Sequence, residues 1–447
     1  MSKNSHGGTT SNSKNIYEII YPELEDDRVC SEIRDQACRE APHNYFWNLC
    51  SGMASKLAEQ LASPSIVLTW ILAALGAPHA AIGLLQPAKE VGSMFPQLIV
   101  AGKIRAFKKR KLIWSAAACF QGLCLLVIYL LTFSNADQLT WPIILAVFFL
   151  FSVGSGVASV AFSDVLGKTI PKGARGSLLG MRGMLGGTLS LMAAIMIHFY
   201  LKESSPIHHY AYLILFASFL WFVSSLCFYQ IDEFAGEVEG GKSAIHQLST
   251  GFKLLKQDRG FLSFLISRTY LLSITLSIPF YTLHARELGQ SPLLQMGGLI
   301  FALSLSQILS SPFWGKFSDI TANKVMSVSG LIALASGLIA VVVEWLRHAD
   351  GIGPEVAAII YLLVFFGLGM AQAGARIGRK TYLVDYAPSK ERPLYVAMAN
   401  TWMGMMTILG AGLGVFSDRF GLTETLYFIL VLNLLGVLSS FRMREIK

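Results

Sequence analysis

Long apolar stretches separated by short polar turns dominate the chain from about residue 45 to residue 441. Most stretches hold about 20 residues, the length that a helix needs to cross the ~30 Å hydrocarbon core of a bilayer. The predicted fold class is therefore an all-α membrane protein. The pattern predicts twelve transmembrane helices, at residues 45–74, 79–101, 112–133, 141–164, 177–200, 210–230, 261–283, 292–313, 325–346, 356–378, 394–416 and 424–441.

One hydrophilic connection divides these helices into two sets of six, and polar segments flank them at both ends. Such segments lack the apolar side chains that a packed core requires. The predicted organisation is a polar tail over residues 1–43, a first six-helix half over 44–230, a linker over 231–260, a second six-helix half over 261–441 and a short tail over 442–447.

Composition supports a membrane protein and excludes several other classes. Hydrophobic residues make up 53% of the chain and charged residues only 14%, against roughly 25% charged in soluble domains. A soluble chain of this composition would leave many apolar side chains without a core to enter. The six cysteines form no CxxC pair, and none of them lies beside a histidine pair. We therefore expect no metal and no cofactor.

The positions of the basic residues are more informative than the net charge of +8. Of the 36 Lys and Arg residues, 27 lie in the tails, the linker and the even-numbered connections, and only four lie in odd-numbered connections. Cytoplasmic connections of membrane proteins carry such an excess of basic residues. Both termini are therefore expected on the cytoplasmic side of the cell (inner) membrane, and nucleic acid is not expected as a partner.

The two halves share a weak internal repeat and a short motif. At a shift of 213 residues, Gly102 corresponds to Gly315 and Gly154 to Gly367. The first pair opens the connections after the second and eighth predicted helices. The second connection has an acid, Asp319, four residues after its glycine, whereas the first has Ala106 and a strongly basic run. Parallel repeats of six helices are the plan of one class of transporter.

Over residues 45–441 the chain therefore resembles the major facilitator superfamily, whose signature at these connections is Gly-x-x-x-Asp-Arg/Lys-x-Gly-Arg/Lys-Arg/Lys. The resemblance implies two pseudo-symmetric halves that rock around a central site in a functional monomer. It also implies a cytoplasmic latch that contains the acid of the motif. Because the first copy has Ala106 there, we expect gating to rely more on Asp319, and topology control is the alternative role of the basic run. The implied gating residues are Gly102, Arg110, Lys111, Gly315, Asp319 and Lys324.

Two predicted helices carry acidic residues within polar stripes. Lys56 and Glu59 share one face of the first helix, and Lys89 and Glu90 lie near the middle of the second. An ionisable side chain at this depth costs about 2.5–3.5 kcal/mol on insertion scales, so it is expected to face a cavity or a partner. Glu59 or Glu90 is therefore a candidate to bind a coupling proton. The alternative is a purely structural Lys56–Glu59 or Lys89–Glu90 ion pair.

Basic residues outnumber acidic ones in the predicted membrane interior. Arg268 is the repeat partner of Lys56, and Arg182 and Arg376 add two further cations. Such an excess favours an anionic solute, because Arg binds carboxylate or phosphate through two hydrogen bonds. A position at the cytoplasmic rim is the alternative for Arg182 and Arg376. The expected cavity residues are Lys56, Gln60, Gln86, Lys89, Arg182, Arg268, Tyr270, Gln307, Gln372, Arg376, Asn400 and Trp402.

These features favour a secondary active transporter that takes up a small organic anion or a carboxylate-bearing chelate together with protons. One alternative is a proton-coupled exporter of drugs or other amphiphiles. A second alternative is a non-transporting membrane sensor or assembly partner. An enzyme is not expected, because the sequence contains neither a Ser/His/Asp constellation nor an HExxH motif. The expected partners are an anionic small molecule and the lipid bilayer.

Overall fold

The computed structural model describes residues 39–104, 107–134, 140–201, 205–235, 254–255, 257–288, 291–388 and 392–443, and all regular structure in these ranges is helical. Before the linker lie α3 (Ala41–Leu61), α4 (Val67–Ala74), α5 (His79–Gly83), α6 (Leu85–Ile104), α7 (Lys111–Phe133), α8 (Thr140–Thr169), α9 (Lys172–Tyr200) and α10 (Ile207–Tyr229). After it lie α12 (Arg259–Leu271), α13 (Ser273–Leu288), the short 3₁₀ helix η1 (Pro292–Leu294), α14 (Met296–Ile320), α15 (Ala322–His348), α16 (Pro354–Tyr386), α17 (Arg392–Gly410), α18 (Gly412–Phe420) and α19 (Leu422–Phe441). The all-α class is confirmed, whereas most of the predicted tails and linker lies outside the described residues.

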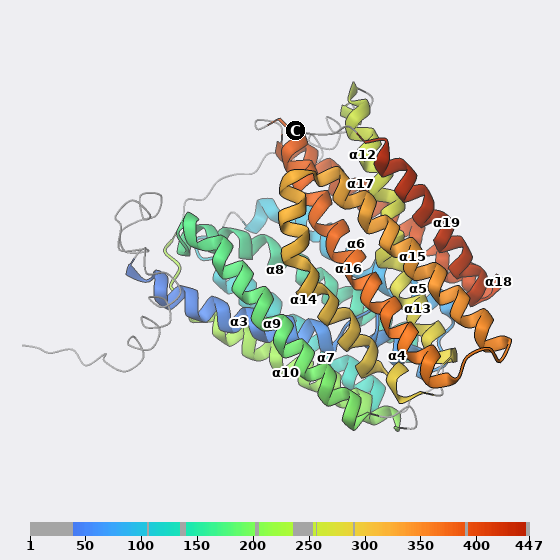
Figure 1. The fold of residues 1–447 in the computed structure, drawn as a ribbon. Coiled ribbons are helices and arrows are strands. Elements are labelled where there is room, and N and C mark those ends of the chain that lie inside the picture. The colour runs from blue at the N-terminus through green and yellow to red at the C-terminus, as the bar shows by residue number, and fades with distance from the viewer. Residues whose placement is uncertain are drawn as a thin grey trace, which may run out of the picture.

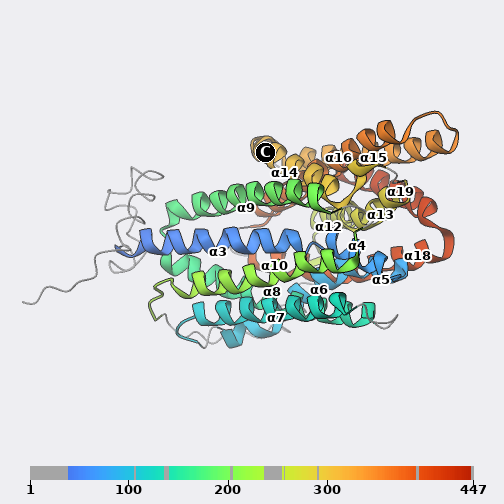
Figure 2. The same ribbon diagram turned by 90° about the horizontal axis from the view of Figure 1, so that it is seen from below.

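The helices pack in two groups, which we call the N-terminal group (α3–α10) and the C-terminal group (α12–α19). We call the face on which α3 begins and α19 ends the terminal face, and the opposite one the distal face. Figure 1 shows the terminal ends diverging, with α3 and α10 running to the left and α12 and α17 running to the top. Figure 2 shows α3, α7, α8, α9 and α10 side by side in the N-terminal group.

Four of the predicted membrane helices are broken in the structure. The span predicted at 45–74 is α3 and α4, and the span at 79–101 is α5 and α6. The spans at 261–283 and 394–416 are likewise α12 with α13 and α17 with α18. Pro64 lies at the first break, where it cannot continue a helical hydrogen-bond ladder. Broken helices in a membrane occur where the freed backbone lies inside protein or lines a cavity.

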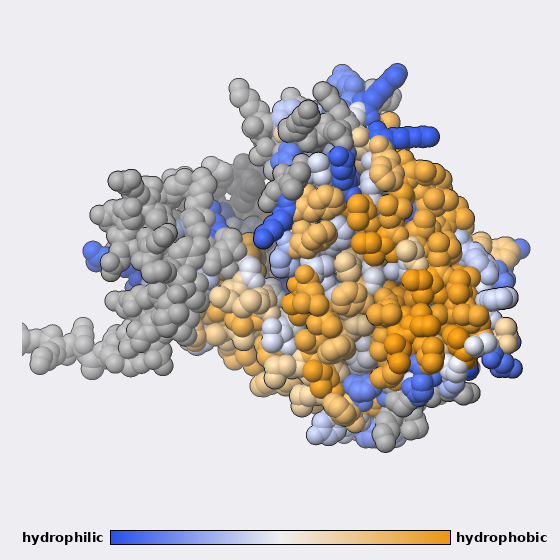
Figure 3. Space-filling view, in the orientation of Figure 1, coloured by the Kyte–Doolittle hydropathy of each residue, from blue (hydrophilic) through white to orange (hydrophobic). Residues whose placement is uncertain are grey.

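Nine segments of the described chain are long and apolar enough to cross a membrane. The predicted helices at 45–74, 79–101 and 394–416 are not among them, so the twelve-helix arrangement is confirmed in part. The outer surface is apolar, since Leu338, Val342 and Leu363 on α15 and α16 are 51%, 51% and 62% exposed. Figure 3 shows hydrophobic side chains gathered over the C-terminal group, with hydrophilic ones toward its ends. An apolar belt of this kind suits lipid rather than water.

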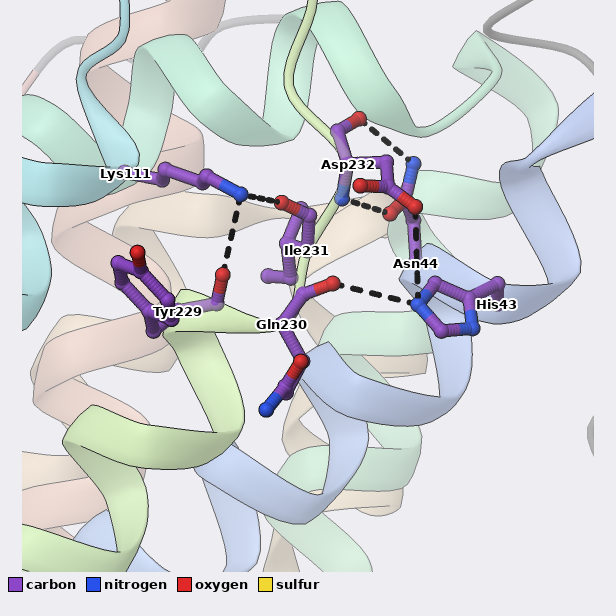
Figure 4. Close-up of polar contacts among 7 residues, drawn as sticks. All are labelled: His43, Asn44, Lys111, Tyr229, Gln230, Ile231 and Asp232. Carbon is purple, nitrogen blue, oxygen red and sulfur yellow. Dashed lines mark hydrogen bonds and ion pairs between the residues drawn. The ribbon is translucent and has the colours of Figure 1, made fainter. Parts of the chain in front are cut away.

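The chain leaving α10 is tied to the beginnings of α3 and α7 (Figure 4). The Asn44 side chain donates to the Asp232 carbonyl at 3.2 Å and accepts from its N–H at 2.7 Å. Lys111 Nζ donates to the carbonyls of Tyr229 and Ile231 at 3.0 and 2.6 Å. Because these bonds satisfy backbone groups beyond the end of α10, they hold three helices of the N-terminal group together.

One carboxylate joins three helices of the C-terminal group at the terminal face. Asp258 caps α12 by accepting from the Phe261 N–H at 2.9 Å. It also accepts from the hydroxyls of Tyr386 and Tyr395, at the end of α16 and near the start of α17, at 2.5 and 2.8 Å. Partial burial alone would raise the pKa of Asp258, but the hydrogen bonds from Tyr386, Phe261 and Tyr395 lower it below the ordinary 3.8.

Replacing Asp258 by alanine is expected to lower the free energy of unfolding by about 1–2 kcal/mol, because the variant loses a helix cap and two side-chain hydrogen bonds. The lowered pKa means that the carboxylate stabilises the fold above its unfolded value of 3.8 and ceases to do so as pH falls through the folded value. Denaturant titration in detergent checks both points. A penalty equal at about pH 7 and about pH 3 would contradict this account.

Candidate functional site

A cavity of about 800 Å³ lies between the two groups of helices. Residues of α3, α6 and α9 form the wall on the N-terminal side, and residues of α12, α14, α16 and α17 form most of the opposite wall. Its volume is typical of a site for a small molecule. Among the described residues, five basic and two acidic side chains line this cavity: Lys56, Lys89, Arg268, Arg376, Arg379, Glu59 and Glu90.

The N-terminal wall follows the two polar stripes that the sequence predicts. Lys56 and Glu59 of α3 line the cavity, and Lys56 Nζ donates to a Glu59 carboxylate oxygen at 3.0 Å. Gln60 lines the same wall, as do Gln86, Lys89 and Glu90 of α6. The Lys56–Glu59 pair is about half exposed, so solvent weakens its attraction. Both candidate proton-binding carboxylates therefore face the cavity rather than lipid.

The C-terminal wall is basic. Arg268 of α12 lies within electrostatic reach of Arg379 of α16 and of Glu90 across the cavity. Arg268 is 8% exposed, and its Nε has no hydrogen-bond partner among the described residues. On the same wall, Gln307 Nε2 donates to Gln372 Oε1 at 3.1 Å. A buried donor without a partner is rare in folded proteins, and the arginine that carries it also lines the cavity.

Four expected cavity residues do not line the cavity. The Arg182 guanidinium donates to Asn48 Oδ1 and lies over the Phe162 ring, inside the N-terminal group. Trp402 Nε1 donates to Thr269 Oγ1 at 2.9 Å, which joins α17 to α12. Tyr270 and Asn400 are half-buried elsewhere on these two helices. In this conformation the four side chains serve helix packing or lie off the cavity wall.

One arginine of the cavity wall, Arg379, was not expected from the sequence. Arg379 follows Arg376 by three positions on α16, so both lie on one face of that helix. The residues around Arg379 are polar, and the predicted helix was expected to end at residue 378. The real helix continues to Tyr386. The spacing of the two arginines could have indicated that both face the cavity. The helix boundary expected at residue 378 instead placed Arg379 outside the predicted helix.

The expected gating residues lie at the terminal ends of the groups. Arg110 pairs with Asp164 of α8, and Lys168 Nζ lies 2.7 Å from Asp164 and 3.2 Å from the buried Glu233. Glu233 also accepts from the Lys111 backbone N–H at 2.7 Å. Ala106 stands where the motif has an acid. Asp164 of α8 and Glu233 at the start of the linker instead provide carboxylates to the basic side chains of Arg110 and Lys168. Asp164, Lys168 and Glu233 were not among the gating residues expected from the sequence.

The structure indicates less about the gating role of the other four expected residues, Gly102, Gly315, Asp319 and Lys324. Gly315 lies in α14, and a Cβ placed there would meet no atom within 4 Å. Lys324 is exposed near the start of α15. Gly102 and Asp319 lie within α6 and α14, but the Asp319 side chain and the surroundings of Gly102 are outside the described part of the structure.

The two groups meet closely at the distal face. The Asp418 carboxylate of α18 accepts from the backbone N–H groups of His79 and Ala80 at 2.6 and 2.7 Å. Thr282 Oγ1 of α13 donates to the Ser65 carbonyl at 3.0 Å. These bonds join the groups on the side away from the diverging helix ends (Figure 1). The cavity therefore opens toward the terminal face.

The distal contact depends on two glycines that allow α5 and α18 to approach. A Cβ on Gly83 would lie 2.8 Å from Gly414 Cα and 2.9 Å from its N. Gly83→Ala is expected to disfavour this conformation by about fivefold or more, because neither backbone atom can yield without separating the groups. Electron–electron distance measurements between spin labels at the exposed Lys108 and Lys316 check this, and a shorter distance is expected.

Gly167→Ala is the matched control, because a Cβ on Gly167 of α8 would meet no atom within 4 Å. It is expected to leave the distance distribution unchanged. The same shift in both variants, or in neither, would show that the distal glycine contact does not set the conformation.

The chain resembles known transporters in sequence and in fold. The family model described as Major Facilitator Superfamily matches residues 49–341 and 269–446. An uncharacterized protein of Mycobacterium tuberculosis is 24% identical over 434 residues, covering 90% of this chain and 77% of that protein. Multidrug resistance protein 2 of Bacillus subtilis is 26% identical over 146 residues, which cover 32% of this chain and 34% of that protein.

Solved structures with the same fold include the nucleoside transporter NupG and a D-xylose-proton symporter. Their TM-scores are 0.71 and 0.65, each at 12% identity. The alignments cover 89% and 90% of this chain, and 99% and 98% of the solved chains. At such identity the likeness shows the fold alone, while the family model covers most of the described helices. The chain therefore belongs to the major facilitator superfamily of secondary transporters.

Proposed function

We propose that this protein carries a small organic anion, or a chelate bearing carboxylates, into the cell in symport with protons. The family assignment supports a transporter rather than an enzyme. The observation that carries the choice of solute is Arg268, buried on the cavity wall with a donor that lacks a partner. Arg376 and Arg379 on the same wall extend the attraction for carboxylate or phosphate groups.

The proposed direction of transport is inward, and the expected topology is consistent with it. The excess of basic residues in the tails, the linker and the even-numbered connections assigns the terminal face to the cytoplasm of a cell membrane. The cavity opens toward that face, so this conformation is inward-open and would release an imported solute. Two six-helix halves, over residues 44–230 and 261–441, would rock around the cavity as they alternate its access.

Coupling to protons is assigned to Glu59 or Glu90. Both carboxylates line the cavity, and both lie beside cations that an anionic solute would also engage. Protonation of either acid would strengthen the net positive charge of the site and so favour anion binding. Solute and proton would then bind together, which is the requirement for symport.

Export of amphiphiles is the second candidate. The partial similarity to Multidrug resistance protein 2 of Bacillus subtilis favours it, because that match covers about a third of this chain. Uptake of an anion is preferred, because the buried Arg268 and the other cations of the cavity wall would hinder a neutral or cationic amphiphile.

Charge movement in proteoliposomes tests the proposed function. Solid-supported-membrane recording with a panel of organic anions and chelates should give a solute-triggered current at acidic external pH. Arg268→Gln is expected to reduce this current by about tenfold or more, through loss of a charge-assisted hydrogen bond. Glu59→Gln or Glu90→Gln should abolish proton-driven accumulation while leaving solute exchange intact.

Lys316→Gln is the control for lost charge, because Lys316 is exposed and does not line the cavity. It should transport like the wild type. Full current in Arg268→Gln would refute the anion site. Current only with amphiphiles, in the outward direction, would favour export instead.

A further inference from the structure

A second cluster of ionisable side chains lies in the C-terminal group near the distal face. His284 of α13 is 2% exposed. Its Nε2 lies 3.3 Å from a carboxylate oxygen of Glu344 on α15, and its Nδ1 lies 2.7 Å from the Tyr361 hydroxyl on α16. Thr423 of α19 donates to the other Glu344 oxygen at 2.6 Å. Four helices thus meet at one histidine–carboxylate pair, and none of these residues lines the cavity.

This pair is costly for a membrane protein to maintain. Ionisable residues inside membrane segments are rare, and apolar side chains of similar size would fill the same space without desolvation. Glu344 keeps a side-chain exposure of 14%, whereas the Tyr361 hydroxyl is buried among helices. Histidine is the side chain whose charge ordinarily changes between pH 5 and 8. The cluster therefore has the composition of a proton-binding site.

The contacts accommodate both protonation states of the ring. When His284 is neutral, Nε2–H donates to Glu344 and Nδ1 accepts from the Tyr361 hydroxyl. When it is protonated, Nδ1–H donates to the Tyr361 oxygen, and that hydroxyl turns to the Tyr281 carbonyl, 3.3 Å away. Every polar group of the pair keeps a partner in either state. Protonation then adds the attraction between an imidazolium and a carboxylate in a largely buried position.

The contacts of this pair lead toward the distal face rather than toward the cavity. His348 at the end of α15 has a side chain that is 80% exposed, and its Nε2 lies 3.9 Å from Glu344. His348 and Glu344 thus connect the buried ring to distal solvent. The cavity opens toward the opposite face.

The same helix segment carries a contact between the two groups. The break at Leu272 separates α13 from α12, and Pro279 removes one hydrogen bond within α13. Thr282, two residues before His284, donates to the Ser65 carbonyl of the N-terminal group. The position of α13 therefore depends on its attachment to α15 and α16 as well as on the distal contact.

We propose that His284 and Glu344 form an allosteric proton-binding site, through which the pH at the distal face sets the balance between the two conformations of the transporter. This inference goes beyond the proposed function, because it depends neither on the solute nor on Glu59 or Glu90. Protonation strengthens the hold of α15 and α16 on α13 in the position that contacts Ser65. Low pH therefore favours the conformation with the distal face closed.

Other titratable groups lie near enough to compete for this role. Tyr281 and Glu287 on α13 act electrostatically on Tyr361, and His348 faces Glu344 from α15. From α5, His79 contacts Ser417 Oγ through Nδ1 at 2.9 Å within the distal contact itself. His79 is the strongest rival, because its titration would act directly on the join between the groups.

The test measures the distance between spin labels at Lys108 and Lys316 in nanodiscs, with the native cysteines replaced by serine. Between about pH 8 and about pH 5.5 the ratio of long to short distances should rise about fivefold in the otherwise unmodified protein. His284→Gln and Glu344→Gln should each abolish this rise, since neither amide titrates. Tyr361→Phe, which removes one hydroxyl, should reduce it.

Two controls separate this site from other histidines. His209→Gln changes an exposed histidine of the N-terminal group and should respond like the unmodified protein. His79→Gln should keep the pH response while shifting the ratio at every pH. A ratio independent of pH would overturn the proposal. So would a full response in monodisperse His284→Gln or Glu344→Gln, or a response abolished by His79→Gln alone.

Discussion

Positive charge in the membrane interior, in excess of the acids that face it, is the constraint on which the rest of this structure depends. Burying a guanidinium without a partner is unfavourable, so the fold has to give each such group water, an acid or a solute. Arg182 finds Asn48 and the Phe162 ring inside the N-terminal group. Arg268 instead reaches a cavity that opens to one face. Under the proposed function, the need to neutralise it would connect solute binding to the conformation of the carrier.

The arrangement of contacts between the groups follows from the same need. At the distal face the groups are joined by hydrogen bonds. On the terminal side they diverge, so the basic wall of the cavity is open to water there. Closing the terminal side would bring Glu59 and Glu90 toward the arginines of the opposite wall. Among the described cavity residues, two acids do not balance five cations. Under the proposed function, an anion in the cavity would make up part of the difference and so lower the electrostatic cost of closure.

Much of this could be predicted from the sequence, because helix periodicity places residues on faces without knowledge of tertiary structure. The polar stripes of α3 and α6 fall on the cavity wall as expected, and Arg268 lies opposite them. Partners distant in sequence could not be predicted. Asp164 supplies the acid that Ala106 lacks, across a helix pair. His284 meets Glu344 only because four helices converge, and nothing in either local sequence indicates that pairing.

Thermal unfolding of the purified protein in the presence of organic anions tests the central claim most directly, because a ligand that binds the folded state raises the melting temperature. The account predicts that at least one carboxylate-bearing anion stabilises the wild type, and that this stabilisation is lost in Arg268→Gln but kept in Lys316→Gln. Equal stabilisation of wild type and Arg268→Gln by that anion would contradict the claim that Arg268 forms the solute site.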